Sequence, residues 1–235
     1  GIKRGFYPLL SSLDISGDAL VLQGEGKTST ELRASGAFPA LIMRHGSINN
    51  VVRDLYFTHN NPASAMSGIA LLQLGDNNTG NFASNIVQSC EFYDNENYTG
   101  DAIGIANLSG GAVYRNTIQN IIVTDFQNAI YSRTAASGTG FTNDNVFFDI
   151  YGNKSRKFLL VKNGIAGAFD GNRFYACRHQ QASGTGDIFD YLTENSGRAL
   201  YAAHFGCFAW DMTSGYVYAQ TNASTELELH GCLPS

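Results

Sequence analysis

The sequence predicts an all-β protein, a single right-handed parallel β-helix of about seven coils. Three observations predict it: a composition rich in turn formers and aromatic residues, two interleaved series of short β-favouring segments, and a repeat near 29 residues. Only 15% of the 235 residues are charged, against about a quarter in typical domains, and there are 15 Phe and 12 Tyr. Turn formers combined with aromatic and β-branched residues are typical of all-β proteins with many short turns.

The first series of segments has an apolar body and a polar end. Runs of four to eight β-favouring residues bounded by Gly, Asn, Ser or Asp predict strands. The clear copies are Val51 to Asn60 (VVRDLYFTHN), Ile86 to Asn95 (IVQSCEFYDN), Asn120 to Asn128 (NIIVTDFQN), Asn145 to Asn153 (NVFFDIYGN) and Asn172 to Gln180 (NRFYACRHQ). Weaker copies are HFGCFAWD (204–211) and ELHGC (228–232).

The second series lies between these copies, at 68–74, 101–108, 128–134, 157–163, 187–195 and 215–222. Its marker residues are separated by 34, 27, 29, 29 and 29 positions; they are Ile69, Ile103, Ile130, Leu159, Ile188 and Val217. Two or three short strands per repeat, with no helical pattern between them, predict a β-solenoid. A propeller blade would need about 40 residues. We therefore expect residues 1–235 to form one β-helix domain, and the start at Gly1 without Met suggests a fragment of a longer chain.

The opening segment, QGEGKTST (23–30), looks like a nucleotide-binding phosphate loop. That motif needs a glycine where Val21 stands, and a helix directly after the loop. The segment is better interpreted as a strand, DALVLQGEG (18–26), which runs into a glycine corner before the next strand, PALIMRHG (39–46).

The stretch LVLQGEGKTSTELRASG (20–36) resembles the opening coil of the pectate-lyase-like superfamily, in which a strand ending in Gly-x-Gly precedes a Ser/Thr-Thr corner. The coils with an N-x-F-x-x pattern resemble the β-helix body of bacteriophage tailspike and capsule-depolymerase proteins. The resemblance covers nearly the whole chain and is one of pattern. It implies a virion tail protein that acts on a polysaccharide of the bacterial surface (capsule, exopolysaccharide or O-antigen) and assembles as a homotrimer.

Stacked coils place inward side chains in continuous apolar columns at the strand spacing of about 4.8 Å. One predicted column contains Phe57, Phe92, Phe126, Ile150 and Cys177, and its neighbour contains Leu55, Cys90, Thr124, Phe148 and Tyr175. This arrangement favours free, buried thiols for Cys90 and Cys177. The four cysteines show no C-x-x-C spacing, so a metal site is not expected from them.

The residues between these columns predict an acidic stack on the outer surface, formed by Glu91, Asp125 and Asp149. Like charges in line destabilise a sheet and raise the pKa of at least one carboxyl group, which suits a general acid. Glycoside hydrolysis needs two such groups, about 5–5.5 Å apart for retention and about 6.5–9.5 Å apart for inversion. We therefore predict Glu91, Asp125 and Asp149 as catalytic residues, with Asp125 as the general acid; the other interpretation is that they are ordinary solvated acids.

Tyrosines beside acids suit a sugar, because the ring packs on the pyranose face while polar groups bind the hydroxyls. The predicted substrate-binding residues are Tyr56, Tyr93, Gln127, Tyr151 and Arg178. Leu71, Tyr131, Leu160 and Tyr218 are expected to form an outward apolar column, which predicts the surface covered in a homotrimer; the other interpretation is that a loop of the same chain covers it.

We expect no cofactor and no metal. We also expect no nucleic-acid partner, because the formal net charge is −5, and no membrane insertion, because no apolar run reaches membrane-spanning length. Two other functions stay open. The chain could be a non-catalytic carbohydrate-binding or structural segment of a viral tail, or it could be a secreted polysaccharide lyase.

Overall fold

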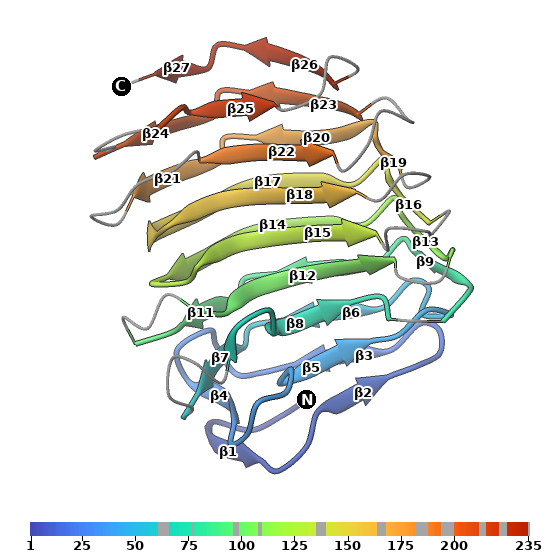
Figure 1. The fold of residues 1–235 in the computed structure, drawn as a ribbon. Helices are drawn as coiled ribbons and strands as arrows, with labels where there is room; N and C mark the ends of the chain where they lie inside the picture. The colour runs from blue at the N-terminus through green and yellow to red at the C-terminus, as the bar shows by residue number, and fades with distance from the viewer. Residues whose placement is uncertain are drawn as a thin grey trace.

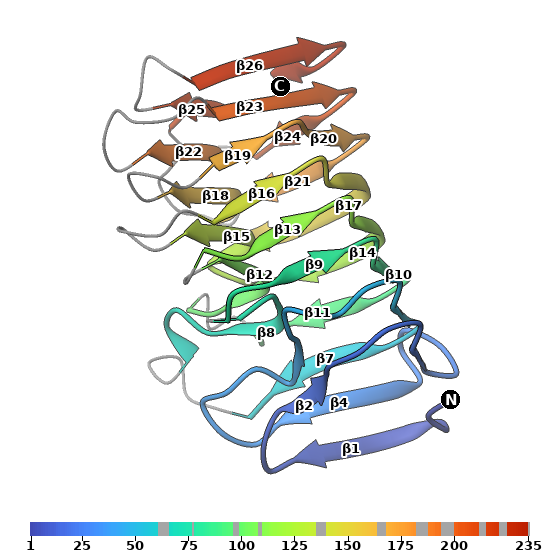
Figure 2. The same cartoon turned by 90° about the vertical axis from the view of Figure 1, so that its right-hand side faces the viewer.

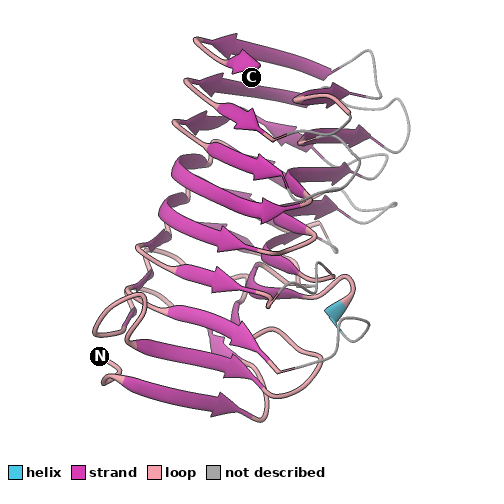
Figure 3. Ribbon diagram, turned by 90° about the vertical axis from the view of Figure 1, so that its left-hand side faces the viewer, coloured by secondary structure: helices cyan, strands magenta, loops and turns pink. Residues whose placement is uncertain are grey.

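The computed structural model describes residues 1–60, 66–76, 78–95, 99–107, 110–134, 140–163, 168–181, 188–193, 200–211, 215–220 and 225–234. In this part of the chain the coils stack one above the next, from the N-terminal coil to the C-terminal one (Figure 1). All strand pairs are parallel, and the one helical segment drawn in Figure 3 is a short 3₁₀ turn at Met66. The predicted parallel β-helix is confirmed.

The strands form three sheets that run along the stack. The first sheet contains β1 (Gly5–Leu9), β3 (Val21–Gln23), β4 (Thr30–Ala34), β6 (Val51–Arg53), β7 (Tyr56–His59), β10 (Ile86–Gln88), β11 (Glu91–Tyr93), β14 (Thr117–Thr124), β17 (Val146–Ser155), β20 (Asn172–Tyr175), β21 (Arg178–Gln181), β23 (Leu200–Phe205), β24 (Phe208–Trp210), β26 (Thr225–His230) and β27 (Leu233–Pro234).

The second sheet has one strand per coil: β2 (Leu13–Ile15), β5 (Leu41–Met43), β8 (Ala70–Leu74), β12 (Asp101–Asn107), β15 (Asn128–Thr134), β18 (Lys157–Asn163), β22 (Phe189–Thr193) and β25 (Tyr218–Gln220). The third sheet, seen in Figure 2, contains β9 (Asn81–Ala83), β13 (Ala112–Tyr114), β16 (Phe141–Asn143) and β19 (Ala168–Asp170).

Each coil turns its corners through single residues in the left-handed backbone region. The first corner precedes the strands of the first sheet and contains Ala19, Asn49, Ser84, Arg115 and Asp144. The second corner bends the first sheet and contains Asp54, Ser89, Asn120, Asp149 and Ala176. The third corner lies at the end of the first sheet and contains Asn95, Asp125, Lys154 and Asp211. These residues have φ between 49° and 69°. L-residues pay about 1–2 kcal/mol each for this conformation, so other interactions must hold the corners.

A ladder of buried asparagines holds the first corner. Asn145 Nδ2 donates to Asn172 Oδ1 at 2.9 Å and to the Val113 carbonyl oxygen at 3.2 Å. Its own Oδ1 accepts from the backbone N and from Nδ2 of Asn116, at 3.0 and 2.9 Å. Asn85 bonds to Asn116 in the same way. Each side chain therefore joins its coil to the next and satisfies corner backbone groups that the sheets leave unpaired.

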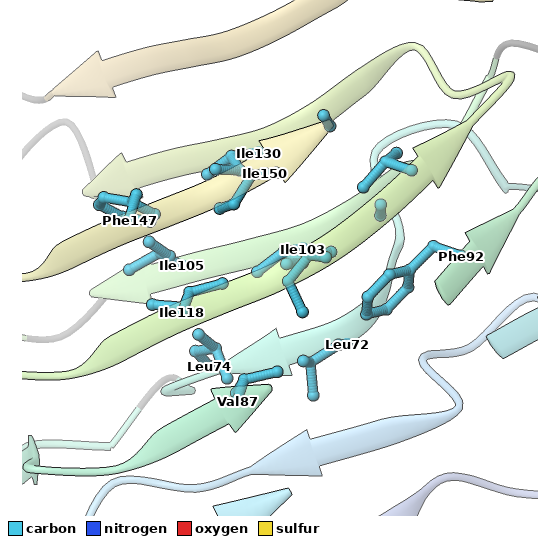
Figure 4. Packing of buried hydrophobic residues seen from close by; sticks show 14 of the residues in the cluster. Leu72, Leu74, Val87, Phe92, Ile103, Ile105, Ile118, Ile130, Phe147 and Ile150 are labelled. Atoms are coloured by element: carbon cyan, nitrogen blue, oxygen red, sulfur yellow. The ribbon is translucent and has the colours of Figure 1, made fainter. Parts of the chain in front are cut away.

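The apolar core fills the interior between the sheets (Figure 4), as the alternation in the strands predicts. The composition of the predicted columns is partly wrong. Phe57 and Phe92 do stack, with ring centroids 4.8 Å apart, but Val123 continues their column in place of Phe126. Phe148 is 48% exposed, and Thr124 lies on the outer surface.

The four cysteines are free, as expected for Cys90 and Cys177. Strand register places Cys90 and Cys177 in one column and not in two neighbouring ones, because each lies directly before the paired residues of β11 and β21. Cys207 continues this column in the next coil. Burial raises the pKa of the Cys90 thiol to about 12, which keeps it protonated.

The apolar face predicted for a trimer is only half right. Tyr131 and Leu160 pair across β15 and β18 and point outward. Leu71 is fully buried, and Tyr218 packs against the core beside Phe189. The second sheet therefore offers a smaller apolar surface than the sequence suggested, and the trimer itself stays a prediction.

Candidate functional site

The three predicted carboxylates do not form one stack. Glu91 lies on the outer surface and pairs with Ile122 in the next coil. Asp125 follows Ile122 by three positions and is buried at the third corner, 3% exposed. Asp149 lies at the second corner, two residues before Tyr151, and Tyr151 is the residue in line with Ile122. The catalytic assignment of Asp125 and Asp149 therefore loses its geometric basis.

The error has a simple cause. The coils differ in length, and the ladder asparagines are separated by 35, 31, 29 and 27 residues. The predicted stack matches Asp125 with Asp149, 24 positions apart, whereas the structure pairs Ile122 with Tyr151, 29 positions apart. This moved the third coil by several positions relative to its neighbours, and a shifted register changes which side chains face outward.

Four of the five predicted sugar-binding residues do lie on one surface. Tyr56, Tyr93, Tyr151 and Arg178 point outward from β7, β11, β17 and β21 and are partly buried. Gln127 does not join them, since it follows the third corner and lines a hollow on the second sheet.

We call this surface the outer flank; it belongs to the half of the first sheet that follows the second corner. The first outer row contains Glu31, Tyr56, Glu91, Ile122, Tyr151, Arg178 and Phe208. The second outer row contains Arg33, Thr58, Tyr93, Thr124, Asn153, Gln180 and Trp210. Aromatic, amide, hydroxyl and charged groups thus follow one another along the stack.

Two carboxylates flank a tyrosine at one end of the first outer row. Glu31 pairs with Tyr56, and Tyr56 pairs with Glu91. Two strand steps separate the Cα atoms of Glu31 and Glu91 by about 9–10 Å, and flexible glutamate side chains can bring their carboxyl groups within the range of about 6.5–9.5 Å used for inversion. Burial, together with the charges of Glu91 and Glu31, raises the pKa of Tyr56 to about 12, so its ring stays a neutral platform.

The two carboxylates have different surroundings. Glu91 is partly buried, and loss of hydration raises its pKa, which favours a proton donor. Glu31 accepts a hydrogen bond from Arg33 Nε at 2.7 Å and one from Thr58 Oγ1 at 2.6 Å. Arg33 Nη2 lies 2.5 Å from the same oxygen. These contacts fix the position of the Glu31 carboxylate at the end of the row.

A hollow of about 260 Å³ opens beside this row. Its wall includes His59, whose Nε2 hydrogen bonds to Asp94 Oδ1, and both side chains are buried. The full lining is Glu31, Arg33, Tyr56, Thr58, His59, Asn60, Tyr93 and Asn95.

The far end of the outer flank is an aromatic platform. The rings of Tyr151 and Trp210 stack at 5.8 Å, and Trp210 contacts Phe208 at 5.5 Å. The Arg178 guanidinium lies over Tyr151, 5.7 Å from the ring centroid, while its Nη2 donates to Asp149 Oδ1 at 2.8 Å. Rings of this kind, with polar groups at their edges, suit the faces and hydroxyls of sugars.

Sequence reasoning missed Glu31 and Trp210. The signal for Glu31 is the alternation in TELRA (30–34), which lies where the sequence predicts a corner and forms β4 in the structure. Trp210 lies in a weak copy of the first series, HFGCFAWD, and a coil alignment based on that copy could have placed it beside Tyr151.

Comparisons with known proteins do not identify a family. No family model matches the chain, and no curated protein matches it. Among solved structures, a crystal structure of the Agl-KA catalytic domain is similar over 97% of this chain and 62% of its own, with 10% identity and a TM-score of 0.18. The chain thus spans less than two thirds of that protein, and so loose a superposition gives no information about function.

Two further findings concern the described residues alone. The described residues contain no helix that is long and apolar enough to cross a membrane. Nor do three or more His, Cys, Asp or Glu side chains gather there in an arrangement that could hold a metal ion.

Proposed function

We propose that this chain binds a polysaccharide along the outer flank and hydrolyses it beside Tyr56. The observation that carries the proposal is the row Glu31, Tyr56, Glu91, because it places two carboxyl groups in different environments on either side of an aromatic platform. The aromatic cluster around Trp210 would hold more distant sugars of the same chain.

In this mechanism Glu91 is the general acid and protonates the oxygen of the leaving sugar. Glu31, held in place by Arg33 and Thr58, is the general base and removes a proton from the attacking water. Water attacks the anomeric carbon on the face opposite the leaving oxygen, the glycosidic C–O bond breaks, and the new hydroxyl appears with inverted configuration. The proton that Glu91 gives up is replaced from solvent.

The test is a screen of purified bacterial surface polysaccharides with a reducing-end assay. Against a polysaccharide that is cleaved, Glu91→Gln and Glu31→Gln should each lower kcat by about 100-fold or more. Glu226→Gln, an exposed change on β26, is the matched control and should keep full activity. Full activity in both flank variants would overturn the proposal.

A binding-only function is the second candidate, and the aromatic platform favours it. Tyr151 and Trp210 lie away from the two carboxylates and can hold a glycan without cleaving it. Under this function, Trp210→Ala and Tyr151→Ala abolish glycan binding, and no reducing ends or unsaturated uronates appear with any substrate. An unsaturated product would instead indicate the lyase.

The bacterial source of the glycan, the virion tail location and the homotrimer follow from the resemblance to tailspikes and stay predictions. Light scattering tests the trimer: a stable monomer at micromolar concentration would contradict it.

A further inference from the structure

A hollow of about 280 Å³ opens on the second sheet, near the ends of its strands. Its volume is close to the lower limit of about 300 Å³ for small-molecule sites. Four successive strands contribute to its lining, with Ile42 from β5, Gln73 from β8, Ala106 from β12 and Arg133 from β15. The connections that follow β5 and β8 add Arg44, Asp76 and Asn78.

The carboxylate that lines this hollow already has its partners. Asp76 Oδ2 accepts hydrogen bonds from Arg44 Nη1 at 3.2 Å and from Asn78 Nδ2 at 2.7 Å. Its Oδ1 accepts from the Asn78 backbone N at 3.0 Å and lies 2.8 Å from His45 Nδ1. Arg44 is shared with Asp14, since its Nη2 donates to Asp14 Oδ2 at 2.7 Å. The charges of Arg44 and Asp76 are therefore matched within the protein.

Arg133 lines the same hollow without a carboxylate partner. Among the described residues its guanidinium forms no ion pair and no hydrogen bond, and it lies over the Tyr131 ring, 5.8 Å from the centroid. The side chain is partly exposed, so a ligand in the hollow can reach it. Arg133 is in register with Lys162 of β18. Like charges in line on adjacent strands destabilise a sheet, and an anion beside Arg133 would offset this repulsion.

Gln73 offers a hydrogen-bond acceptor to the hollow. Its Nε2 donates to the Leu74 and Gly104 carbonyl oxygens at 3.3 and 3.2 Å, which fixes the orientation of the amide. Its Oε1 receives no hydrogen bond from the described residues and is open to solvent. A hydroxyl group on a ligand can therefore donate to it.

Ala106 and Ile42 give the hollow its apolar surface. Ala106 is in register with Arg133, and its short side chain leaves space beside the guanidinium. Ile42 is in register with Gln73. Two strand steps and two residues separate Gln73 from Arg133, so their Cα atoms are about 12 Å apart. Because both side chains are long, a single sugar ring can contact both.

We propose that this hollow binds an acidic sugar unit, a hydroxylated ring that carries one carboxylate. The carboxylate pairs with the Arg133 guanidinium, which matches its planar shape and can donate two N–H groups to it. A ring hydroxyl donates to Gln73 Oε1, and ring C–H groups pack on Ile42 and Ala106.

Two other ligand classes fit this hollow less well. A neutral sugar leaves the charge of Arg133 unmatched. A phosphate ion carries more negative charge and offers few hydroxyl donors, so Asp76 repels it and Gln73 Oε1 stays without a donor. Since the hollow lies on the second sheet, binding there does not depend on cleavage at the outer flank.

The test is an NMR titration of the whole chain at low salt with the methyl glycosides of glucuronic acid and N-acetylneuraminic acid. The methyl glycoside of glucose and inorganic phosphate are the comparison ligands. At least one acidic glycoside should bind about tenfold or more tightly than either of them. Arg133→Gln should weaken that binding about tenfold or more, the loss expected for one charge-assisted pair.

Arg115→Gln is the matched control. The Arg115 guanidinium also lies 5.8 Å from the centroid of a tyrosine ring, that of Tyr114, but Arg115 does not line the hollow. This variant should bind the acidic glycoside as the wild type does.

Three results would overturn the proposal. They are the absence of binding of both acidic glycosides, equally tight binding of the glucoside or of phosphate, and undiminished binding in Arg133→Gln. Glu31→Gln and Glu91→Gln should leave this binding unchanged, whereas they should lower cleavage at the outer flank, so the two proposals fail separately.

Discussion

Replacing Asp101 by asparagine should stabilise the protein, and the gain should grow with pH. In the unfolded chain this carboxyl group loses its proton near its ordinary pKa of 3.8, whereas the folded chain retains it until about pH 7. The stability that a protonated Asp101 contributes is therefore complete below pH 3.8 and is lost as pH rises to about 7. Asparagine keeps the shape and the acceptor for Asn128 but has no proton to lose.

The size of the effect follows from the difference in pKa. Each pKa unit corresponds to about 1.4 kcal/mol, so the roughly three units between unfolded and folded Asp101 amount to about 4 kcal/mol above pH 7. The gain from Asp101→Asn should be about 3 kcal/mol larger at about pH 8 than at about pH 5. In a chain of this length that corresponds to a difference in Tm of about 6–12 °C.

The assay is thermal unfolding of wild type and Asp101→Asn across this pH range, followed by circular dichroism. Asp170→Asn, which changes an exposed acid on β19, is the control for the loss of one carboxyl group. If Asp101→Asn shifts Tm equally at every pH, the carboxyl group ionises as it would in water, and the reasoning from its burial is refuted.

Three other changes test the fold. Asn145→Ala should lower the free energy of unfolding by about 2–4 kcal/mol, because it leaves several buried partners unsatisfied; urea denaturation measures this, and a loss below about 1 kcal/mol would contradict it. Gly152→Ala should cost about 1–3 kcal/mol, since the new Cβ would lie 2.4 Å from His179 Nδ1; an unchanged Tm would show that the imidazole moves freely. Burial lowers the pKa of His179 to about 3, so its contribution to stability is present above pH 6.5 and falls by about 1.4 kcal/mol per pH unit below that. His179→Leu should remove this slope in acid-unfolding curves, and an identical slope in the variant would exclude His179 as its source.

The fold could be predicted because its signals are repeated. Each coil repeats the same alternation of apolar and polar residues, so one ambiguous segment does not change the predicted fold class. The outward positions of Tyr56 and Glu91 were likewise predicted correctly, since the coils of β7 and β11 align without ambiguity.

The register of the later coils could not be predicted in the same way. Asn116 and Asn120 each lie within two positions of a following isoleucine, and nothing local shows that Asn116 belongs to the buried ladder while Asn120 turns a corner. Asp and Asn, which adopt the left-handed conformation most readily, occupy eight of the fourteen such non-glycine positions among the described residues, but Ala176 and Arg115 occupy others, so the sequence marks only part of the corners. The hydrogen bond from Asn128 Nδ2 to Asp101 Oδ1 likewise joins two coils, and no single segment of the sequence records it.

Because the coils are stacked one on the next, each coil interacts mainly with its nearest neighbours in the stack. In the described residues the sheets join each coil to the coils directly above and below it, and the bond from His45 to Asn107 at 3.0 Å reaches one coil further. A change in one coil should therefore lose influence with each interface that it crosses. Glu91 and Asp101 belong to one coil, whereas Trp210 lies four strand steps further on. A change at Asp101 should therefore be felt at Glu91 and hardly at Trp210, and cooperativity in this protein should be a local property.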